Sequence, residues 1–378
     1  MVIDVRRDHS LRIPRPDVSV KIGTPNACNQ CHSNKSAQWA YDIIYKWYGP
    51  APSGFQQFAE ALNGGAEGAP GAEHALAALV ANRDQPAIAR ATALSLLAAF
   101  TPIATDEAIE VGVKDDSPLV RPATAHALSN SNVRGDLEVP VLLLNDPARV
   151  VRIETAEMLA GVPAGVFPSG LSAAFSRATD EYIAAQEFDA DRPEAHMNLG
   201  LLFAREGKPD RAEDELKIAL SLDPTFAPAS VNLADLYRGL GRDPEGEAVL
   251  RTALRRSSND PSLLHALGLL MVREKQSANA IDMLGSAVHL DPANARYAYV
   301  YAVALNDTGR TKAAIDVLEA NILRHPYDRD SLIALVTFLE QERDFQRALS
   351  YAQLLNKLEP DNPQVRQLIS ELSAHRNG

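Results

Sequence analysis

Cys28, Cys31 and His32 are the residues of this chain whose types and spacing could do chemistry. They form the run Cys28-Asn29-Gln30-Cys31-His32, which holds both cysteines of the 378 residues. Two thiols three positions apart, followed at once by an imidazole, are typical of covalent haem attachment. The thiols bond to the haem vinyl groups as thioethers, and the histidine coordinates the iron. The run therefore predicts haem c, with Cys28 and Cys31 as thioether residues and His32 as the proximal iron ligand.

Two other kinds of site use a Cys-x-x-Cys pair. A structural zinc ion needs four nitrogen or sulfur ligands, so His32 and one remote histidine would have to complete the set. A thioredoxin-like redox pair lies beside a βαβ unit, and no strand pattern occurs near this run. Both alternatives fit the run less well than haem does.

The segment before the motif predicts an extended arm over residues 1–27, because it has little periodicity and several helix-breaking residues: Pro14, Pro16, Gly23 and Pro25. Such an arm could wrap a haem. His9 is the other imidazole here, and it is a candidate distal iron ligand to this haem or to a neighbouring one. The alternative is a surface histidine in a polar turn. We treat residues 1–48 as the haem-binding segment.

Apolar residues at helical spacing predict a helix over residues 34–48, directly after the motif, and Gly49-Pro50 ends it. This stretch is rich in aromatic residues, which would pack against haem or in a core. Residues 49–71 are rich in glycine and proline and predict a linker.

Composition limits the class of partner. The chain is 46% apolar, and no apolar run approaches the ~20 residues of a membrane span. Its net charge is −12, with +3 on residues 1–50 and −15 on the rest. A basic haem end could steer an acidic redox protein partner. An acidic protein lacks the basic surface that a nucleic acid needs, so a nucleic-acid partner is excluded.

The first residues lack the apolar core of an export signal. Because c-type cytochromes are matured outside the cytoplasm, we expect a periplasmic or otherwise extracytoplasmic bacterial protein whose export signal was lost with a missing N-terminus.

Residues 72–165 contain a repeat of 31 residues. Three sets of residues recur at this spacing: Asp84, Asp115 and Asp146; Arg90, Arg121 and Arg152; and Leu97, Leu128 and Leu159. The unit resembles HEAT repeats, in which an aspartate in one turn and an arginine on the following helix pair from one repeat to the next. A helical domain with coincidental matches is the alternative.

From residue 171 to residue 376 the period becomes 34. Small residues, leucines and prolines recur at this spacing, as in Ala212, Ala280, Ala314 and Ala348 or Pro224, Pro292, Pro326 and Pro360. This pattern resembles tetratricopeptide repeats (TPRs), which place small residues where two helices cross. Five repeats are predicted over residues 193–362, with flanking helices at 171–190 and 363–376. The fold class is therefore all-α: an extended haem-binding arm followed by an α-solenoid of HEAT-like and then TPR hairpins.

TPR arrays hold an extended peptide or a partner helix along the first helix of each repeat. The resemblance places nine residues in this groove: Met197, Leu201, Val231, Asp235, His265, Leu269, Tyr299, Val303 and Ile333. The lining is mostly apolar. Asn198 and Asn232 match positions that grip a C-terminal carboxylate in some arrays, but the basic residues of such a clamp are absent.

Taken together, the motif segment, the aromatic helix and the repeats resemble the C-terminal portion of multihaem c-type cytochromes that carry TPRs. The single Cys-x-x-Cys-His run departs from that family, whose members have several. The resemblance implies an extracytoplasmic electron-transfer component, rather than a catalytic subunit, that contacts a redox protein or an upstream haem domain. The alternative is a TPR/HEAT protein-interaction scaffold without bound haem.

Overall fold

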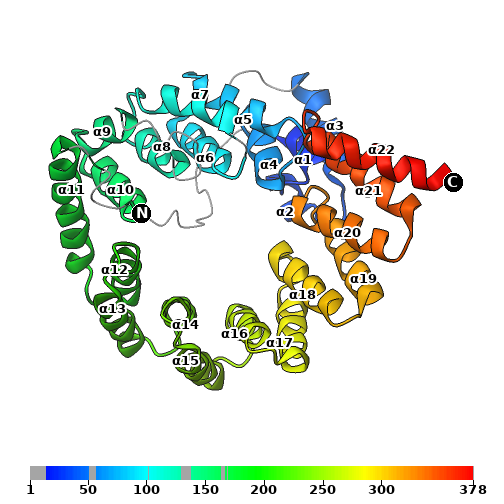
Figure 1. The fold of residues 1–378 in the computed structure, drawn as a ribbon. Coiled ribbons are helices and arrows are strands. Elements are labelled where there is room, and N and C mark those ends of the chain that lie inside the picture. Colours follow the sequence, from blue (N-terminus) through cyan, green and yellow to red (C-terminus); the bar gives the residue numbers. More distant parts are fainter. Residues whose placement is uncertain are drawn as a thin grey trace.

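The computed structural model describes residues 14–50, 57–100, 102–128, 138–162, 167 and 169–377. These residues form 22 helices and no strand, so the predicted all-α class is confirmed. The helices follow one another around a ring (Figure 1). None of them within the described ranges has the length and the hydropathy of a membrane-spanning segment.

The first four helices surround the motif: Pro16–Ile22 (α1), Ala27–Cys31 (α2), Ala37–Tyr48 (α3) and Ala59–Glu67 (α4). The extended arm predicted over residues 1–27 is wrong for its described part, because α1 lies there and α2 begins at residue 27. Pro16 begins α1, where the missing N–H of proline costs no hydrogen bond. Gly23 ends it with a left-handed φ of 70°. The predicted linker likewise contains α4.

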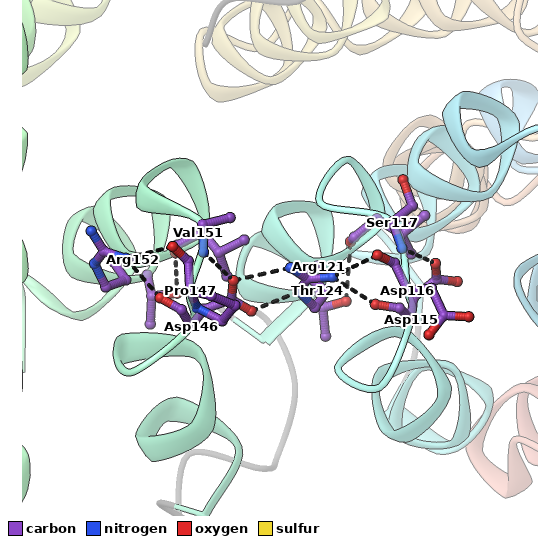
Figure 2. Close-up of polar contacts among 12 residues, drawn as sticks. Asp115, Asp116, Ser117, Arg121, Thr124, Asp146, Pro147, Val151 and Arg152 are labelled. Atoms are coloured by element: carbon purple, nitrogen blue, oxygen red, sulfur yellow. Dashed lines mark hydrogen bonds and ion pairs between the residues drawn. The ribbon is translucent and has the colours of Figure 1, made fainter.

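Six helices follow in the region of the 31-residue period: Ala72–Ala81 (α5), Ala87–Leu97 (α6), Pro102–Gly112 (α7), Val120–Leu128 (α8), Glu138–Leu144 (α9) and Arg149–Leu159 (α10). Arginines at the starts of α6 and α8 pair with the aspartates expected from the spacing. Arg90 donates to Asp115. Arg121 donates to both carboxylate oxygens of Asp146, at 2.6 and 3.0 Å (Figure 2). The pairing is present, and the HEAT resemblance itself stays a prediction.

The long helix Ser169–Phe188 (α11) joins the two kinds of repeat. Arg152 of α10 donates to both carboxylate oxygens of Glu181 on α11, at 3.0 and 2.9 Å. Arg205 of the next helix reaches back to Glu157 of α10 at 3.2 Å. Ala160, Tyr182 and Leu199 share one buried cluster across this junction.

Eleven helices complete the chain: Pro193–Arg205 (α12), Pro209–Leu222 (α13), Ala227–Gly239 (α14), Asp243–Arg256 (α15), Pro261–Arg273 (α16), Ser277–Leu290 (α17), Ala295–Asp307 (α18), Thr311–Ile322 (α19), Arg329–Gln341 (α20), Phe345–Leu358 (α21) and Pro363–Asn377 (α22). The pairs α12/α13 to α20/α21 fall within the five predicted repeats. The first helix of each pair lies on the inner side of the ring, most visibly α14, α16 and α18 (Figure 1). We call α12, α14, α16, α18 and α20 the inner helices.

The two ends of the helical path meet. Gly68, which follows α4, has a left-handed φ of 69°, and a Cβ atom there would lie 3.7 Å from the carbonyl oxygen of Tyr327, just before α20. In Figure 1, the blue N-terminal helices accordingly lie beside the orange and red C-terminal ones.

Candidate functional site

The Cys-x-x-Cys-His run folds as the one-turn helix α2, which side chains of its own segment hold in place. Asn26 caps the helix by accepting from the Asn29 backbone N–H at 3.1 Å, and its amide donates to the Asn29 side chain at 2.7 Å. Asn29 in turn donates to the Lys35 carbonyl at 2.7 Å. These bonds fix the backbone of the motif from both sides.

None of the three chemistry-bearing residues, Cys28, Cys31 and His32, is fully buried. Cys28 and Cys31 are unbridged thiols, one half-buried and one exposed, and residues three apart on a helix share a face. His32 follows as the C-terminal cap residue and is exposed. Its ring lies 4.9 Å from that of Trp39 on α3, so α3 orients the imidazole. Two unbridged thiols on one face with an adjacent exposed imidazole fit the residue requirements of haem attachment.

The remaining predicted metal ligand, His9, lies outside the described residues. Within the described ranges, no three His, Cys, Asp or Glu side chains are placed to hold a metal ion. The zinc interpretation of the motif therefore has no ligand set in this part of the chain.

Aromatic side chains of α3 are open to solvent beside the motif. Tyr45, Trp47 and Tyr48 are 51%, 65% and 79% exposed. Only Ala40 of this helix is fully buried. Core packing therefore does not account for the aromatic residues at the end of α3.

The nine residues predicted for the groove all lie on inner helices, and most are half-buried. Asp235 and Ile333 are exposed. His265 differs, because it is only 8% exposed and stacks on Tyr297 with ring centroids 4.6 Å apart. Tyr297, which the sequence mapping missed, therefore covers His265. The sequence mapping assigned Tyr299 to the groove. It did not include Tyr297, which lies two positions earlier on the same helix.

His265 stays neutral at physiological pH. Burial, with a smaller contribution from the charge of Arg296, lowers its pKa to about 4. Neither ring nitrogen has a hydrogen-bond partner among the described residues. His265 is thus a packing residue of the α16/α18 contact and offers no charge to a ligand.

Most arginines of the inner helices form ion pairs with carboxylates of the chain. Arg205 pairs with Glu157, Arg238 with Asp235 and Arg273 with Asp243. Asn198, one of the two asparagines that match a carboxylate clamp, donates to Gln186 at 3.1 Å. A basic clamp for a C-terminal carboxylate is therefore not formed by these residues.

Comparison with known proteins identifies the repeats. One tetratricopeptide-repeat family model matches residues 203–270, and another matches residues 172–227 and 265–329. The matches run through α11 to α19. The comparison with curated protein sequences gave no significant match.

Several solved structures are similar over about half of this chain. YrrB, a TPR protein with an unusual peptide-binding site, is 20% identical, with 49% of this chain and 95% of that chain covered and a TM-score of 0.38. PilF of Pseudomonas aeruginosa is 20% identical over 51% and 88% of the two chains, with a TM-score of 0.43. MamA of Desulfovibrio magneticus RS-1 is 18% identical over 45% and 97%, with a TM-score of 0.39. This chain contains tetratricopeptide repeats, as its 34-residue period predicted.

Proposed function

We propose that this protein is a protein-interaction scaffold whose inner helices hold a peptide or a helix of a partner. The observation that carries the proposal is the array of inner helices in the TPR region, with half-buried apolar side chains at the groove positions. The peptide-binding site named for YrrB is consistent with this use of the fold.

The ion pairs of the inner-helix arginines indicate what kind of partner segment the groove would bind. Arg205, Arg238 and Arg273 of the inner helices are paired with carboxylates of the chain, so a ligand carboxylate that approached one of them would have to break an existing ion pair. The apolar positions offer contact area instead. We therefore expect an amphipathic segment that presents aliphatic or aromatic side chains, with a polar face turned to solvent.

The test starts from peptides selected against the full chain by display and measures their affinity by fluorescence anisotropy. Leu269→Glu and Tyr299→Glu, on adjacent inner helices, should each weaken binding about tenfold or more, because a buried charge opposes apolar contact. Leu222→Glu is the matched control: it introduces the same charge at an exposed leucine at the end of α13 and should leave affinity unchanged.

Amidation of the peptide C-terminus should also leave affinity unchanged. Selected peptides that lose binding on amidation, or that ignore both inner-helix variants, would contradict the proposed groove.

A second function rests on a separate observation, the free thiols and the adjacent exposed imidazole of α2. We propose that Cys28 and Cys31 attach haem c and that His32 is its proximal ligand, with His9 as the candidate distal ligand. When bound, the haem supplies one-electron transfer. The Trp39 ring would keep the His32 imidazole from turning away. An acidic redox protein partner and an extracytoplasmic location are part of this proposal.

Expression of the chain together with a c-type cytochrome maturation system tests haem attachment. Haem should remain on the chain in a denaturing gel, and Cys28→Ser with Cys31→Ser should abolish this retention. His9→Ala should change the spin state of the iron if His9 is the distal ligand. A chain that stays free of covalent haem, while a control cytochrome in the same cells is loaded, would refute haem attachment and leave the scaffold proposal standing.

A further inference from the structure

The end of α3 carries a cluster of exposed aromatic side chains. Tyr45, Trp47 and Tyr48 stand in its last turn, and each exposes more than half of its surface. We call these three residues, with Lys46 between them, the α3 patch. The rings of Trp47 and Tyr48 meet edge to face with centroids 6.4 Å apart. Adjacent exposed aromatic residues differ from the scattered apolar residues of an ordinary surface, and they mark an interaction site.

The α3 patch is positively charged. Lys46 is exposed and forms no ion pair within the described ranges. Asp42, the one acidic residue of α3, lies a turn earlier and accepts from the Gln38 side chain at 2.8 Å. The patch also belongs to the part of the chain with a net charge of +3, whereas the remainder carries −15. A fitting partner surface therefore combines an exposed apolar side chain with negative charge.

The turn after α11 has this composition. Phe188 ends α11 and is 88% exposed. Exposed carboxylates that form no ion pair in the described part of the chain surround it in the sequence: Glu187, Asp189 and Asp191. Arg192, which follows, is the nearest cation along the chain. The last carbonyl groups of the 20-residue α11 add partial negative charge. We call residues 187–191 the Phe188 turn.

The two surfaces are too far apart to meet within one molecule. Figure 1 shows α3 and α11 on opposite sides of the ring. A contact between the α3 patch and the Phe188 turn therefore needs a second copy of the chain. Because the two surfaces differ, such a contact is heterologous: each pair of copies keeps one free α3 patch and one free Phe188 turn, to which further copies can add.

We propose that the α3 patch of one copy binds the Phe188 turn of a second copy, head to tail. The aromatic side chains of the patch pack against Phe188, and Lys46 lies among the carboxylates of the turn. The contact depends neither on haem attachment nor on a peptide along the inner helices. A contact of one helical turn with one loop belongs to the small interfaces, below ~1,200 Å², which are weak and transient. Self-association is therefore expected at high protein concentration.

Sedimentation velocity of the full chain measures this self-association over about 1–300 µM protein, the range of a weak dissociation constant. At ~0.15 M salt the Debye length is ~8 Å, so the repulsion between two chains of net charge −12 is screened while charges in contact still attract. The weight-average sedimentation coefficient should rise with concentration. A wild type that stays monomeric over the whole range overturns the proposal and leaves the α3 patch to a different protein.

Two variants and their mixture identify the contact. Trp47→Ser damages the α3 patch and Phe188→Ser damages the Phe188 turn, so each variant alone should associate about tenfold or more weakly than the wild type. An equimolar mixture should recover dimers and nothing larger, because each variant supplies the surface that the other lacks. A mixture that stays monomeric overturns the proposal. So does undiminished association of Phe188→Ser alone, which would indicate a symmetric contact between two α3 patches.

Matched controls separate the contact from general effects. Leu323, which follows α19, is 87% exposed and lies outside both surfaces, so Leu323→Ser should leave self-association unchanged. Lys46→Glu should weaken self-association about threefold or more, because it places like charges together. Lys114→Glu changes the net charge equally at an exposed position between α7 and α8 and should have no effect. Equal weakening by Lys46→Glu and Lys114→Glu would mean general repulsion and would overturn the pairing of the two surfaces.

Discussion

At the scale of single residues, the packing of the TPR helices depends on positions where two helices leave no room for a side chain. Gly268 of α16 is one of them, since a Cβ atom there would lie 2.7 Å from Cγ of the buried Leu284. Gly268→Ala should therefore lower the free energy of unfolding by about 1–3 kcal/mol, as overpacking does. Urea unfolding followed by circular dichroism measures the change.

Gly239→Ala is the control for helix propensity. Gly239 ends α14, and a Cβ atom there would meet no described atom within 4 Å. Alanine at this position should be neutral or stabilise by a few tenths of a kcal/mol. If both substitutions had the same effect, close approach to Leu284 would not be what selects glycine at position 268.

Glu213 on α13 is held ionised by three donors. Arg242, Lys217 and Tyr237 donate to its carboxylate at 2.7, 2.6 and 2.9 Å. The hydrogen bond from Arg242, followed by that from Lys217, lowers the pKa of Glu213 from 4.5 to about 2. The folded state therefore binds this proton less readily than the unfolded state does.

A carboxyl group with a lowered folded pKa contributes stability above its unfolded pKa and loses it as the pH falls through the folded value. The wild type should thus lose stability between pH 4.5 and about 2, and Glu213→Gln should lose less over that range. At neutral pH this variant should already be destabilised by about 1–3 kcal/mol. Urea unfolding at a series of pH values measures both effects.

Glu247→Gln serves as the comparison, because Glu247 forms an ordinary i,i+4 pair with Arg251. Its cost should be about 0.3–0.5 kcal/mol. His265 is present in the wild type and in Glu213→Gln alike. Its lowered pKa makes both proteins lose stability as the pH falls from 6.5 to about 4, so this loss cancels when the two are compared. If the free energy of unfolding of the wild type and of Glu213→Gln fell in parallel with pH, the lowered pKa of Glu213 would be contradicted.

At the scale of the helices, the arginine–aspartate pairs tie successive hairpins together. Arg121 donates to both oxygens of Asp146 and to the carbonyl of Asp115 at 2.8 Å, so one side chain bridges two turns (Figure 2). Asp146 is 8% exposed. Arg121→Met leaves this carboxylate without its cation and should cost about 3–5 kcal/mol in urea unfolding.

Arg121→Lys keeps the charge and loses the two-pronged geometry, so its cost should be intermediate. Arg251→Met, on an exposed surface pair, should cost no more than about 0.5 kcal/mol. A cost for Arg121→Met as small as that of Arg251→Met would show that the bridges do not hold the hairpins together.

The two periods of the sequence were sufficient to predict these elements. The 31-residue spacing identified Arg90, Arg121 and their aspartates, and the 34-residue spacing placed the hairpins from α12 to α21. The partner of Arg152 could not be predicted this way, because the repeat type changes there. Position 177, where an aspartate would continue the series, is an arginine, and Glu181 on the longer α11 takes the role.

The short helices around the motif were missed for a physical reason. Proline and glycine were interpreted as interruptions, but Pro16 begins α1 and Gly23 ends it, so both define the helix that they were taken to exclude. Similarly, periodicity placed His265 on the inner helix α16 and gave no indication that Tyr297 covers it. The burial of His265 depends on contacts between neighbouring helices. The spacing of residues along one helix does not predict these contacts.

At the scale of the whole molecule, the meeting of the two ends could not be read from the sequence. The curvature of a solenoid accumulates from small rotations at every repeat, and side-chain volumes at all the interfaces determine them. Here the path returns close enough for Gly68 to approach Tyr327.

Gly68→Val should open this contact, since the valine methyl groups would extend toward the Tyr327 carbonyl oxygen. Small-angle X-ray scattering should then show a larger maximum dimension. Gly71→Val is the matched control: Gly71 has a similar left-handed φ of 76°, yet a Cβ atom there meets no described atom within 4 Å. If both variants expanded equally, backbone strain rather than the contact would be responsible.

The approach of Gly68 to Tyr327 changes the mechanics of the array. An open solenoid behaves as a spring, because its free ends let each interface rotate on its own. A path whose ends touch is a closed linkage, in which a rotation at one joint must be balanced by the others or part the ends. A partner that widens the space between two inner helices would therefore act on the distant junction between Gly68 and Tyr327, with no contact between the partner and that junction.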